Sequence, residues 1–374
     1  MTPNRFFEEI QGRFAFGCMR LPERDGKIDY EEFTRMADAF IDAGLNYFDT
    51  AHGYHNGHSE TAIRDCVTRR YDRSRYVLTD KLTDVYFKEE GDIRPFFDRQ
   101  LEWCGVDYFD FYLMHAQDAR NYPQFRRCRA YETAFELKAE GRIRHVGISF
   151  HDKADVLDRI LTDYPDIEVV QIQLNYADYE DESVESRKVY EICEKHNKPV
   201  LVMEPVKGGS LVRLPEQAQA VFDRLDGGSY ASYALRFAAD FENVCAVLSG
   251  MSTMEQMQDN LSVMTDIRPL SAAEREAIEQ VCGILKGQNT IPCTACRYCV
   301  EGCPKGISIP DLFSCYNAKE HFHDWNQDYY YDIITAKGGR ASDCIRCGRC
   351  ERACPQHLSI RDLLAAVATS FERR

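Results

Sequence analysis

The sequence predicts an α/β fold in which a (β/α)8 TIM barrel is followed by a smaller α-helical unit. Over roughly 265 residues, short apolar runs alternate eight times with longer amphipathic segments, and a TIM barrel typically takes about 250 residues. Near the C-terminus, eight of the sixteen cysteines gather in two copies of one spacing. The 374 residues are enough for one large domain and a small one.

The predicted strands are brief, rich in β-branched or aromatic residues, and bounded by polar residues or glycine. In chain order they are Phe14–Met19, Tyr47–Asp49, Tyr76–Thr79, Phe109–Met114, His145–Ser149, Val169–Gln173, Val200–Glu204 and Val244–Ser249.

The segments between them are predicted helices, several with recognisable ends. Tyr30–Ala43 ends at Gly44, a residue type that favours the C-cap, and Ser59–Arg69 opens on a serine that suits the N-cap. The others are Pro95–Cys104, Gln124–Glu140, Asp152–Thr162, Ser183–Asn197, Ser229–Asp240 and Thr253–Met264.

An open doubly wound sheet is the alternative arrangement of alternating strands and helices. That fold usually carries a G-x-G-x-x-G turn after its first strand. Here the first strand leads into Gly17-Cys18-Met19-Arg20, which has no such spacing. The pattern therefore favours the barrel.

The clustered cysteines follow the spacing C-x2-C-x2-C-x3-C-P twice, which is the ligand pattern of two 4Fe–4S clusters. In two-cluster ferredoxins the fourth cysteine of each run ligates the other cluster. We therefore predict one ligand set of Cys293, Cys296, Cys299 and Cys354, and a second set of Cys344, Cys347, Cys350 and Cys303.

Zinc and disulfides explain this pattern less well. A zinc site needs four ligands, usually in two pairs, and not a third close cysteine with a trailing Cys-Pro. Disulfide frameworks suit small secreted domains. The remaining cysteines are scattered, and we expect them to be small buried apolar residues: Cys18, Cys66, Cys104, Cys128, Cys193, Cys245, Cys282 and Cys315.

The cysteine-rich region is an internal repeat of a cysteine motif followed by a helix. ISIPDL follows the first Cys-Pro and LSIRDL follows the second, with an acidic residue suited to a first helical turn. The aromatic stretch Trp325–Tyr331 lies between the motifs, and we expect it to pack around the clusters. The predicted domains are a barrel at residues 1–268, a helical linker at 269–290, and an α-helical dicluster ferredoxin-like domain at 291–374.

Polar residues fall where the second, third and fourth predicted strands end: Asp49, Tyr54, Lys81 and His115. In a TIM barrel the catalytic groups lie at this carboxyl end. In type, order and strand position these residues resemble the catalytic Asp, Tyr, Lys and His of the aldo/keto reductase family. The resemblance covers about residues 10–265, and the tail resembles ferredoxins, so the chain is similar to the ferredoxin-fused branch of that family.

The resemblance implies reduction of a carbonyl group, which takes a hydride at carbon and a proton at oxygen. Tyr54 is the expected acid. A phenol has a pKa near 10, and a buried cation such as Lys81 would lower it. Asp49 would keep Lys81 charged, and His115 would orient the substrate oxygen and share the proton. The three histidines His52, His55 and His58 crowd the same loop, but their spacing disfavours a metal site.

The resemblance also implies a set of cofactor contacts: Ser149, Gln171, Asn175, Lys207, Gly208, Gly209, Gly250, Gln256 and Asn260. The sequence departs from the family pattern in three respects. Phe150 follows Ser149 in place of the asparagine that holds the nicotinamide carboxamide, and Met203 replaces the aromatic that stacks on its ring. Gly250 and Gln256 stand where Lys and Arg grip the 2′-phosphate of NADP, which wants a cation.

A second reason leaves the barrel cofactor open. Iron–sulfur clusters move one electron at a time, whereas nicotinamide passes two as a hydride, and a flavin connects the two regimes. NAD(P) and a flavin such as FMN therefore both remain candidates beside the two 4Fe–4S clusters.

Two functions follow as hypotheses. The first is an iron–sulfur oxidoreductase that interconverts a carbonyl and an alcohol and exchanges electrons with a ferredoxin or another carrier. The second is an electron-transfer protein whose barrel binds a flavin or redox partner and reduces no carbonyl. Clusters that only brace the tail are a weaker third possibility. The net charge of −15 argues against nucleic acid or an anionic membrane as partner, and the absence of an apolar leader predicts a cytoplasmic protein.

Overall fold

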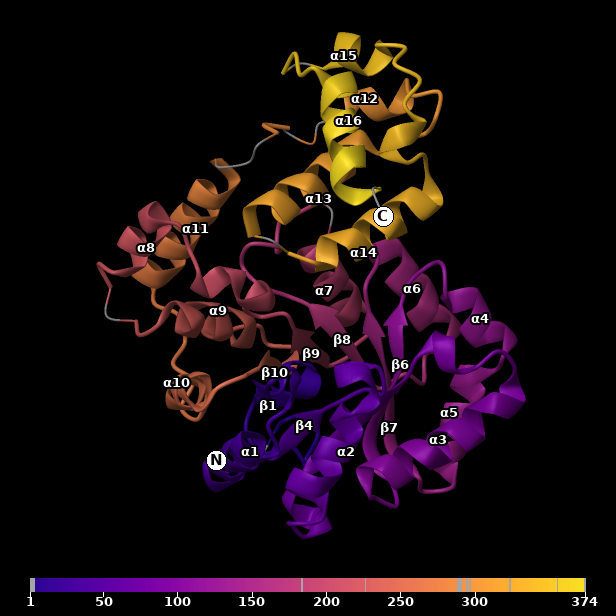
Figure 1. Cartoon of the computed structure of the whole chain (residues 1–374), viewed down its shortest axis with the longest axis vertical. Coiled ribbons are helices and arrows are strands. Elements are labelled where there is room, and N and C mark those ends of the chain that lie inside the picture. The colour runs from indigo at the N-terminus through magenta and orange to yellow at the C-terminus, as the bar shows by residue number, and fades with distance from the viewer. Residues whose placement is uncertain are drawn as a thin grey trace.

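The computed structural model describes residues 4–182, 184–225, 227–287, 291–293, 295, 297–322, 324–354 and 356–372. Within these residues, eight parallel strands close into a barrel in the spatial order β1-β10-β9-β8-β7-β6-β5-β4 (Figure 1). The strands are β1 (Phe14–Gly17), β4 (Tyr47–Asp49), β5 (Val77–Leu82), β6 (Phe109–Gln117), β7 (Ile143–Phe150), β8 (Val169–Gln173), β9 (Val200–Met203) and β10 (Val244–Gly250). A short hairpin of β2 (Glu23–Arg24) and β3 (Lys27–Ile28) follows β1.

All the predicted barrel strands are confirmed, with ends that differ by at most three residues. The surrounding helices are α1 (Tyr30–Asp42), α2 (Ser59–Ile63), α3 (Glu90–Cys104), α4 (Tyr122–Arg127), α5 (Ala130–Ala139), α6 (Ala154–Asp163), α7 (Ser186–Lys195), α8 (Glu216–Phe222), α9 (Tyr230–Ala239), α10 (Met254–Met264) and α11 (Ala272–Gly287). The sequence pattern missed α8. Ser183, the predicted start of α7, lies outside the described residues.

Two predicted helices differ in detail for local reasons. The segment Gln124–Glu140 divides into α4 and α5 because Arg129 adopts a left-handed conformation with φ 51°. Helix α3 begins one turn before the predicted start at Pro95, because Glu89 and Asp92 form a capping box there. Pro95 is the sixth residue of α3, where it removes one backbone hydrogen bond without ending the helix.

The core has two layers, as expected for strands covered on both faces. Outside the barrel, Phe16 and Phe48 pack against Phe33 and Phe40 of α1. Inside it, side chains such as Tyr47, Phe111 and Leu201 fill the lumen together with Phe7 and Ile10 of the N-terminal segment. Gly147 has no room for a side chain, because a β-carbon there would lie 2.5 Å from Val169 Cγ1.

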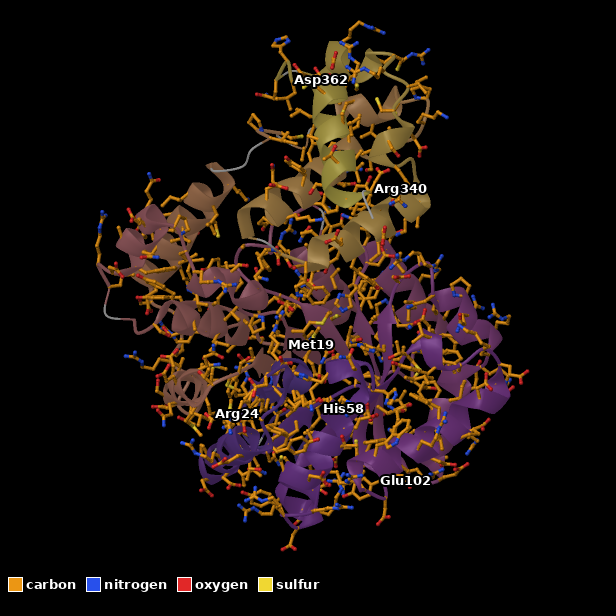
Figure 2. All side chains as sticks on the ribbon, in the orientation of Figure 1. Met19, Arg24, His58, Glu102, Arg340 and Asp362 are labelled. Carbon is orange, nitrogen blue, oxygen red and sulfur yellow. The ribbon has the colours of Figure 1, made fainter. Side chains whose placement is uncertain are left out.

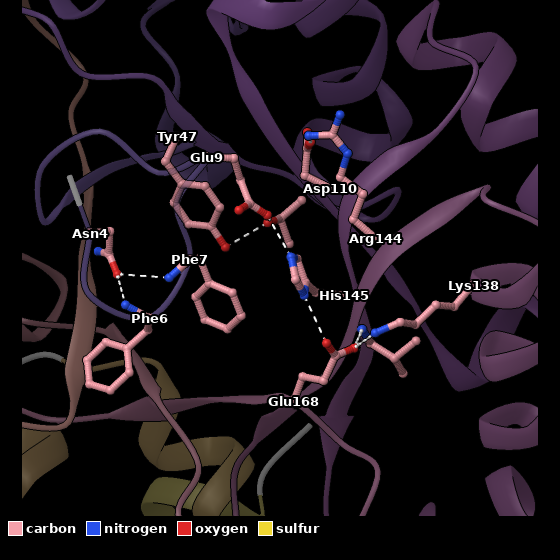
Figure 3. A network of polar contacts seen from close by, with 12 residues as sticks. Asn4, Phe6, Phe7, Glu9, Tyr47, Asp110, Lys138, Arg144, His145 and Glu168 are labelled. Atoms are coloured by element: carbon pink, nitrogen blue, oxygen red, sulfur yellow. Dashed lines mark hydrogen bonds and ion pairs between the residues drawn. The ribbon is translucent and has the colours of Figure 1, made fainter.

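A charged network occupies the amino end of the barrel, opposite the predicted site (Figure 3). His145 lies between Glu9 and Glu168, at 2.6 and 2.9 Å, and Glu168 also pairs with Lys138. Burial alone would lower the pKa of His145, but the hydrogen bonds to both carboxylates outweigh it and raise that pKa to about 9. The imidazolium therefore ties the N-terminal segment to the barrel wall at neutral pH.

The C-terminal unit is helical. Its elements are α12 (Tyr298–Glu301), α13 (Ile309–Phe322), α14 (Asn326–Lys337), α15 (Arg349–Ala353) and α16 (Ile360–Phe371). Leu312, Phe313, Ile333 and Val367 belong to its own apolar core. In Figure 1, α14 lies against the barrel, whereas α12 and α15 lie at the remote end of the unit.

Hydrogen bonds fasten α14 to the carboxyl ends of the barrel strands. The hydroxyl of Tyr330 donates to Gln173 Oε1 at 2.5 Å, and that of Tyr329 donates to Asp118 Oδ2 at 2.9 Å. Lys337 pairs with Asp152 at 2.7 Å. Tyr330 and Tyr331 belong to the apolar core of the C-terminal unit together with Cys299 and Cys350, as expected for packing around the clusters. Tyr329 and Tyr330 also bond the barrel, which the sequence did not predict.

Helix α11, in the predicted linker, packs on α8 through an apolar cluster that includes Ala218, Phe222 and Ile278. We propose that residues 291–374 form the cluster-binding domain, as the sequence predicts. No helix of the described residues is long and apolar enough to cross a bilayer.

The His145 network predicts a pH-dependent stability. Replacing His145 with glutamine is expected to lower the free energy of unfolding by roughly 2 kcal/mol at about pH 6. The stability from the imidazolium is fully present below the ordinary pKa of 6.5 and is lost as the pH rises through about 9. Urea unfolding at a series of pH values should show the difference between the two proteins shrinking over that window. A difference that stays constant would contradict the assignment.

Candidate active site and cluster-binding sites

A cavity of about 890 Å³ opens between the carboxyl end of the barrel and α14. It extends from the loops after β4 and β6 to the start of α10, and its wall also includes Trp325, Asn326, Tyr329 and Tyr330. In Figure 2, Met19, another wall residue, lies near the centre of the barrel below the C-terminal unit. The structure therefore places the cavity where ligands bind in TIM barrels.

Asp49, Tyr54 and Lys81 meet at one end of the cavity. The Lys81 ammonium is fully buried and donates to Asp49 Oδ1 at 2.6 Å, to the Thr50 carbonyl at 2.7 Å and to the Tyr54 hydroxyl at 3.3 Å. The β4–β5 register makes this possible, because Asp49 pairs with Thr79 and Lys81 follows on the same face of β5. Gln171 Nε2 donates to the other oxygen of Asp49 at 3.1 Å.

His115 lies beside this group. A hydrogen bond of 2.7 Å joins its Nδ1 to Thr83 Oγ1, and its ring meets that of Tyr54 edge to face at 6.0 Å. Since Nδ1 is engaged, Nε2 is the nitrogen that remains for a ligand. Burial first, and the Lys81 charge second, lower the pKa of His115 well below its ordinary value, so the ring is neutral at physiological pH.

The electrostatics of Tyr54 and Lys81 are coupled. Burial raises the pKa of Tyr54 and outweighs the lowering by the Lys81 charge, so the phenol keeps its proton at neutral pH. The sequence-based expectation that the Lys81 charge lowers the pKa of Tyr54 is right for this one effect. The net pKa of Tyr54 is nevertheless raised, because burial has the larger effect. Burial disfavours the ammonium of Lys81, yet the charge of Asp49 raises its pKa above the usual value, so it stays charged.

Buried groups behind the site hold the backbone of Lys81. Its N–H donates to Asp80 Oδ1 at 2.8 Å, and its carbonyl accepts from Gln100 Nε2 at 3.1 Å. His52 bonds Glu60 at 2.6 Å, and His55 accepts a hydrogen bond from Leu21 N. These two histidines therefore have structural partners.

The other end of the cavity suits a phosphate-bearing cofactor. Gly208 and Gly209 have φ of 61° and 91°, a conformation that brings backbone close to a ligand. A β-carbon on Gly208 would lie 3.3 Å from an Arg20 guanidinium nitrogen, and one on Gly209 would lie 3.7 Å from Arg213. Two guanidinium groups thus flank a diglycine loop and are donors that fit phosphate, and the Glu204 carboxylate lies 3.6 Å from the guanidinium of Arg20.

Several predicted cofactor residues line this cavity: Gln171, Gly208, Gly209, Gly250, Gln256 and Asn260. The structure does not bring Ser149, Asn175 or Lys207 to the wall. Ser149 accepts a hydrogen bond from Ala116 N, and Asn175 donates to Asp178 at 2.7 Å. The Lys207 ammonium, 2% exposed, pairs with Asp178 at 2.6 Å and Asp324 at 3.2 Å, so it joins the barrel to the C-terminal unit.

Sequence reasoning missed three wall residues. Arg20 and Arg213 reach the diglycine loop from distant segments, and His151 lines the cavity two residues after Ser149. No spacing signal marks the arginines. His151 sits at the end of a predicted strand, where a polar residue is informative in a barrel.

The cysteines form two groups. Cys293, Cys299 and Cys354 line one small apolar cavity with Ile309 and Phe313. Cys303, Cys344, Cys347 and Cys350 line the other. This is the crossed grouping required by two clusters that exchange their fourth ligands. Cys296 lies outside the described residues.

The two motifs have the same backbone conformation. Ala295 and Arg297 in the first copy, and Arg346 and Gly348 in the second, occupy equivalent positions with positive φ between 54° and 72°. A left-handed residue turns the chain sharply, and three of these four are not glycine. Both copies thus wrap around a small volume lined by sulfur and apolar atoms, which fits iron–sulfur clusters.

The fold and these residues define a class: an oxidoreductase barrel joined to an iron–sulfur domain. Residues 13–282 match the aldo/keto reductase family, and residues 292–358 match the 4Fe-4S dicluster domain. The chain therefore belongs to the aldo/keto reductase family and carries a C-terminal 4Fe–4S dicluster domain. The resemblance expected from the sequence is confirmed.

Characterised relatives cover the barrel part. An NADH-specific methylglyoxal reductase of Escherichia coli is 25% identical over 59% of this chain and 79% of its own length. An L-galactose dehydrogenase of Arabidopsis thaliana is 22% identical over 73% of this chain and 90% of its own length. An aldo-keto reductase of Klebsiella pneumoniae in complex with NADPH shares the fold with a TM-score of 0.58 and 22% identity, over 72% of this chain and 90% of that one.

The crossed cysteine grouping makes a prediction about metal content. Replacing Cys303 with serine should remove the cluster of the second group and leave roughly half of the iron and sulfide. Cys315 is a matched control, because it is a buried cysteine of the same domain that lies in neither cavity. Iron and sulfide analysis of anaerobically purified protein measures both variants. Equal iron in the two would contradict the assignment.

Proposed function

We propose that this oxidoreductase interconverts a carbonyl and an alcohol in the barrel and exchanges electrons through two 4Fe–4S clusters. The observation that carries the proposal is the buried Lys81 ammonium, held by Asp49 at 2.6 Å and placed 3.3 Å from the Tyr54 hydroxyl at the cavity wall.

In the reducing direction, the Tyr54 hydroxyl donates its proton to the carbonyl oxygen as negative charge develops there. The fixed charge of Lys81 stabilises the phenolate that remains, which makes the transfer easier than from a free phenol. His115, neutral and bonded to Thr83 through Nδ1, offers Nε2–H to the same oxygen. A reduced nicotinamide bound in the cavity would supply the hydride to carbon.

Charges at the cofactor end favour NAD over NADP as that nicotinamide. Glu255 and Asp259 line the cavity around Gln256, where a 2′-phosphate would need a cation. Carboxylates at such a place suit the free ribose hydroxyl instead. The relative from Escherichia coli is NADH-specific by name, in keeping with this choice.

The two cluster sites differ in their surroundings. Phe313 lines the first site, and the next residue, Ser314, donates to Asp181 in the barrel loop after β8. At the second, Cys347 is exposed. Three basic residues, Lys305, Arg349 and Arg352, are also exposed there. None of the three forms an ion pair with a described residue. We infer that an acidic one-electron carrier meets the second cluster and that electrons pass through the first toward the barrel.

The rival function is electron transfer by a flavin in the barrel without carbonyl reduction. Phe150 and Met203 favour it, because the structure buries Phe150 in the outer core and leaves Met203 in the cavity wall. The usual nicotinamide contacts are therefore missing at both positions, and a flavin would bridge one-electron and two-electron chemistry.

Replacing Tyr54 with phenylalanine tests the proton step. Carbonyl reduction should fall by about 10³-fold, because the general acid is gone, while iron and sulfide stay unchanged. Tyr86→Phe is the control, since this tyrosine lies outside the cavity, stacked on Phe96. Steady-state rates with an aldehyde measure both. Activity retained by the Tyr54 variant would remove this residue from the mechanism.

The cofactor that copurifies under anaerobic conditions separates the two functions. Absorbance and mass spectrometry of the denatured protein should show no flavin, and titration of the native protein should show tighter binding of NADH than of NADPH. The alternative result is a stoichiometric flavin. The first result supports the dehydrogenase chemistry proposed above. A stoichiometric flavin and no affinity for nicotinamides would support the electron-transfer function instead.

A further inference from the structure

The cluster domain supplies part of the wall of the active-site cavity. Trp325, Asn326, Tyr329 and Tyr330, here called the α14 face, line it together with Tyr54 and His115. This contribution comes from a segment more than 200 residues away from the catalytic strands, within the domain that carries the cysteines. Substrate contacts in this chain are therefore shared between the reductase barrel and the iron–sulfur domain.

The rings of the α14 face are held in place. Tyr329 donates to Asp118 Oδ2 at 2.9 Å and to the Ala116 carbonyl at 3.3 Å, directly beside His115. The Arg120 guanidinium lies 4.9 Å from the centre of the same ring. Tyr330 donates to Gln173. Because both hydroxyls are bonded to the barrel, the faces and edges of these rings are fixed surfaces of the cavity.

His151 adds a neutral imidazole to this end. It packs edge to face on Tyr329, at 5.5 Å between ring centres. Burial lowers its pKa to about 4, with Asp118 and Lys81 as opposing neighbours, so the ring is uncharged at neutral pH. An uncharged imidazole offers one N–H and one acceptor, which is enough for one oxygen of a ligand.

Part of the cavity rim is apolar. Six large apolar side chains of the described residues are exposed, and three of them, Met19, Val212 and Trp325, lie on the cavity wall. Trp325 is 50% exposed. The exposed indole of Trp325 and the thioether of Met19 are side chains that bind flat apolar groups, through ring stacking and sulfur contacts.

We propose that the α14 face makes this site selective for flat conjugated carbonyl compounds, namely aryl or α,β-unsaturated aldehydes and ketones, with Trp325 and Tyr329 as specificity-determining residues and His151 as a substrate contact. This rests on the proposed carbonyl chemistry at Tyr54. An open-chain sugar is a poorer fit, because each of its hydroxyls needs a partner in the site. Beside the catalytic group, His151 is the polar side chain that packs on Tyr329, whereas Gln171 is bonded to Asp49 and Asn326 to Glu204.

A binding experiment tests the pocket without turnover. Tryptophan fluorescence of the intact, cluster-loaded protein is titrated with cinnamyl alcohol, with glycerol as the polyhydroxy comparison. Cinnamyl alcohol should change the emission saturably, and Trp325→Phe should abolish the change, because the other tryptophan, Trp103, stacks on His52 outside the cavity. Glycerol should have no effect. A response that survives in the Trp325 variant would overturn the proposal.

A kinetic experiment tests the selectivity. Trp325→Ala should lower kcat/KM for cinnamaldehyde roughly ten-fold, mainly through KM, and change that for glyceraldehyde by less than about two-fold. Trp325→Phe should restore most of the preference, because it restores a ring. Val85→Ala is the matched control, an exposed apolar residue that does not line the cavity.

The outcomes separate the two claims. An equal loss for both aldehydes, or no loss for either, would overturn the role of Trp325. Saturable binding of cinnamyl alcohol to a protein that reduces no aldehyde would defeat the proposed function but leave the aromatic pocket standing. Because Trp325 is half exposed, its truncation should not unfold the chain, and unchanged iron content verifies this.

Discussion

The buried ammonium of Lys81 is the interaction on which the proposed active site depends. A charge removed from water persists only where a counter-charge and hydrogen bonds surround it. Asp49 and the Thr50 carbonyl supply both, and the remaining contact is the Tyr54 hydroxyl. The closed barrel makes this arrangement rigid, because neighbouring strands fix the carboxylate and the ammonium in register. The reactive phenol is thus set beside a permanent positive charge before any ligand binds, which is electrostatic preorganisation.

A second buried ammonium joins the two parts of the chain. Lys207 pairs with Asp178 of the barrel and Asp324 of the cluster domain, and all three groups are almost fully buried. Leaving a buried charge unpaired is costly, so separation of the domains is disfavoured at this point. The junction keeps α14 on the cavity and the first cluster site near the loop after β8. In the proposed function, substrate binding and electron transfer therefore both depend on this one domain contact.

Patterns that repeat along the chain were predictable, and contacts between distant segments were not. The strand alternation gave the barrel, and Asp49, Tyr54, Lys81 and His115 could be found because each stands at a strand end. Cysteine spacing alone indicated two crossed groups. By contrast, the place of α14 depends on Lys207 and on hydroxyls that meet residues over 150 positions away. Arg20 and Arg213 approach the diglycine loop through tertiary folding and leave no local signal. The left-handed Arg129 divides a helix that amphipathic periodicity alone would continue.

The most direct test of this site is the rate of carbonyl reduction after Lys81→Met, which keeps an unbranched side chain, one atom shorter, but removes its charge. Single-turnover rates with cinnamaldehyde should fall by about 10³-fold, since the phenolate formed at Tyr54 then loses its counter-ion. Binding of cinnamyl alcohol and the iron content should remain. A rate near that of the unmodified protein would show that the proton reaches the carbonyl oxygen without this ammonium, and the mechanism described above would be wrong.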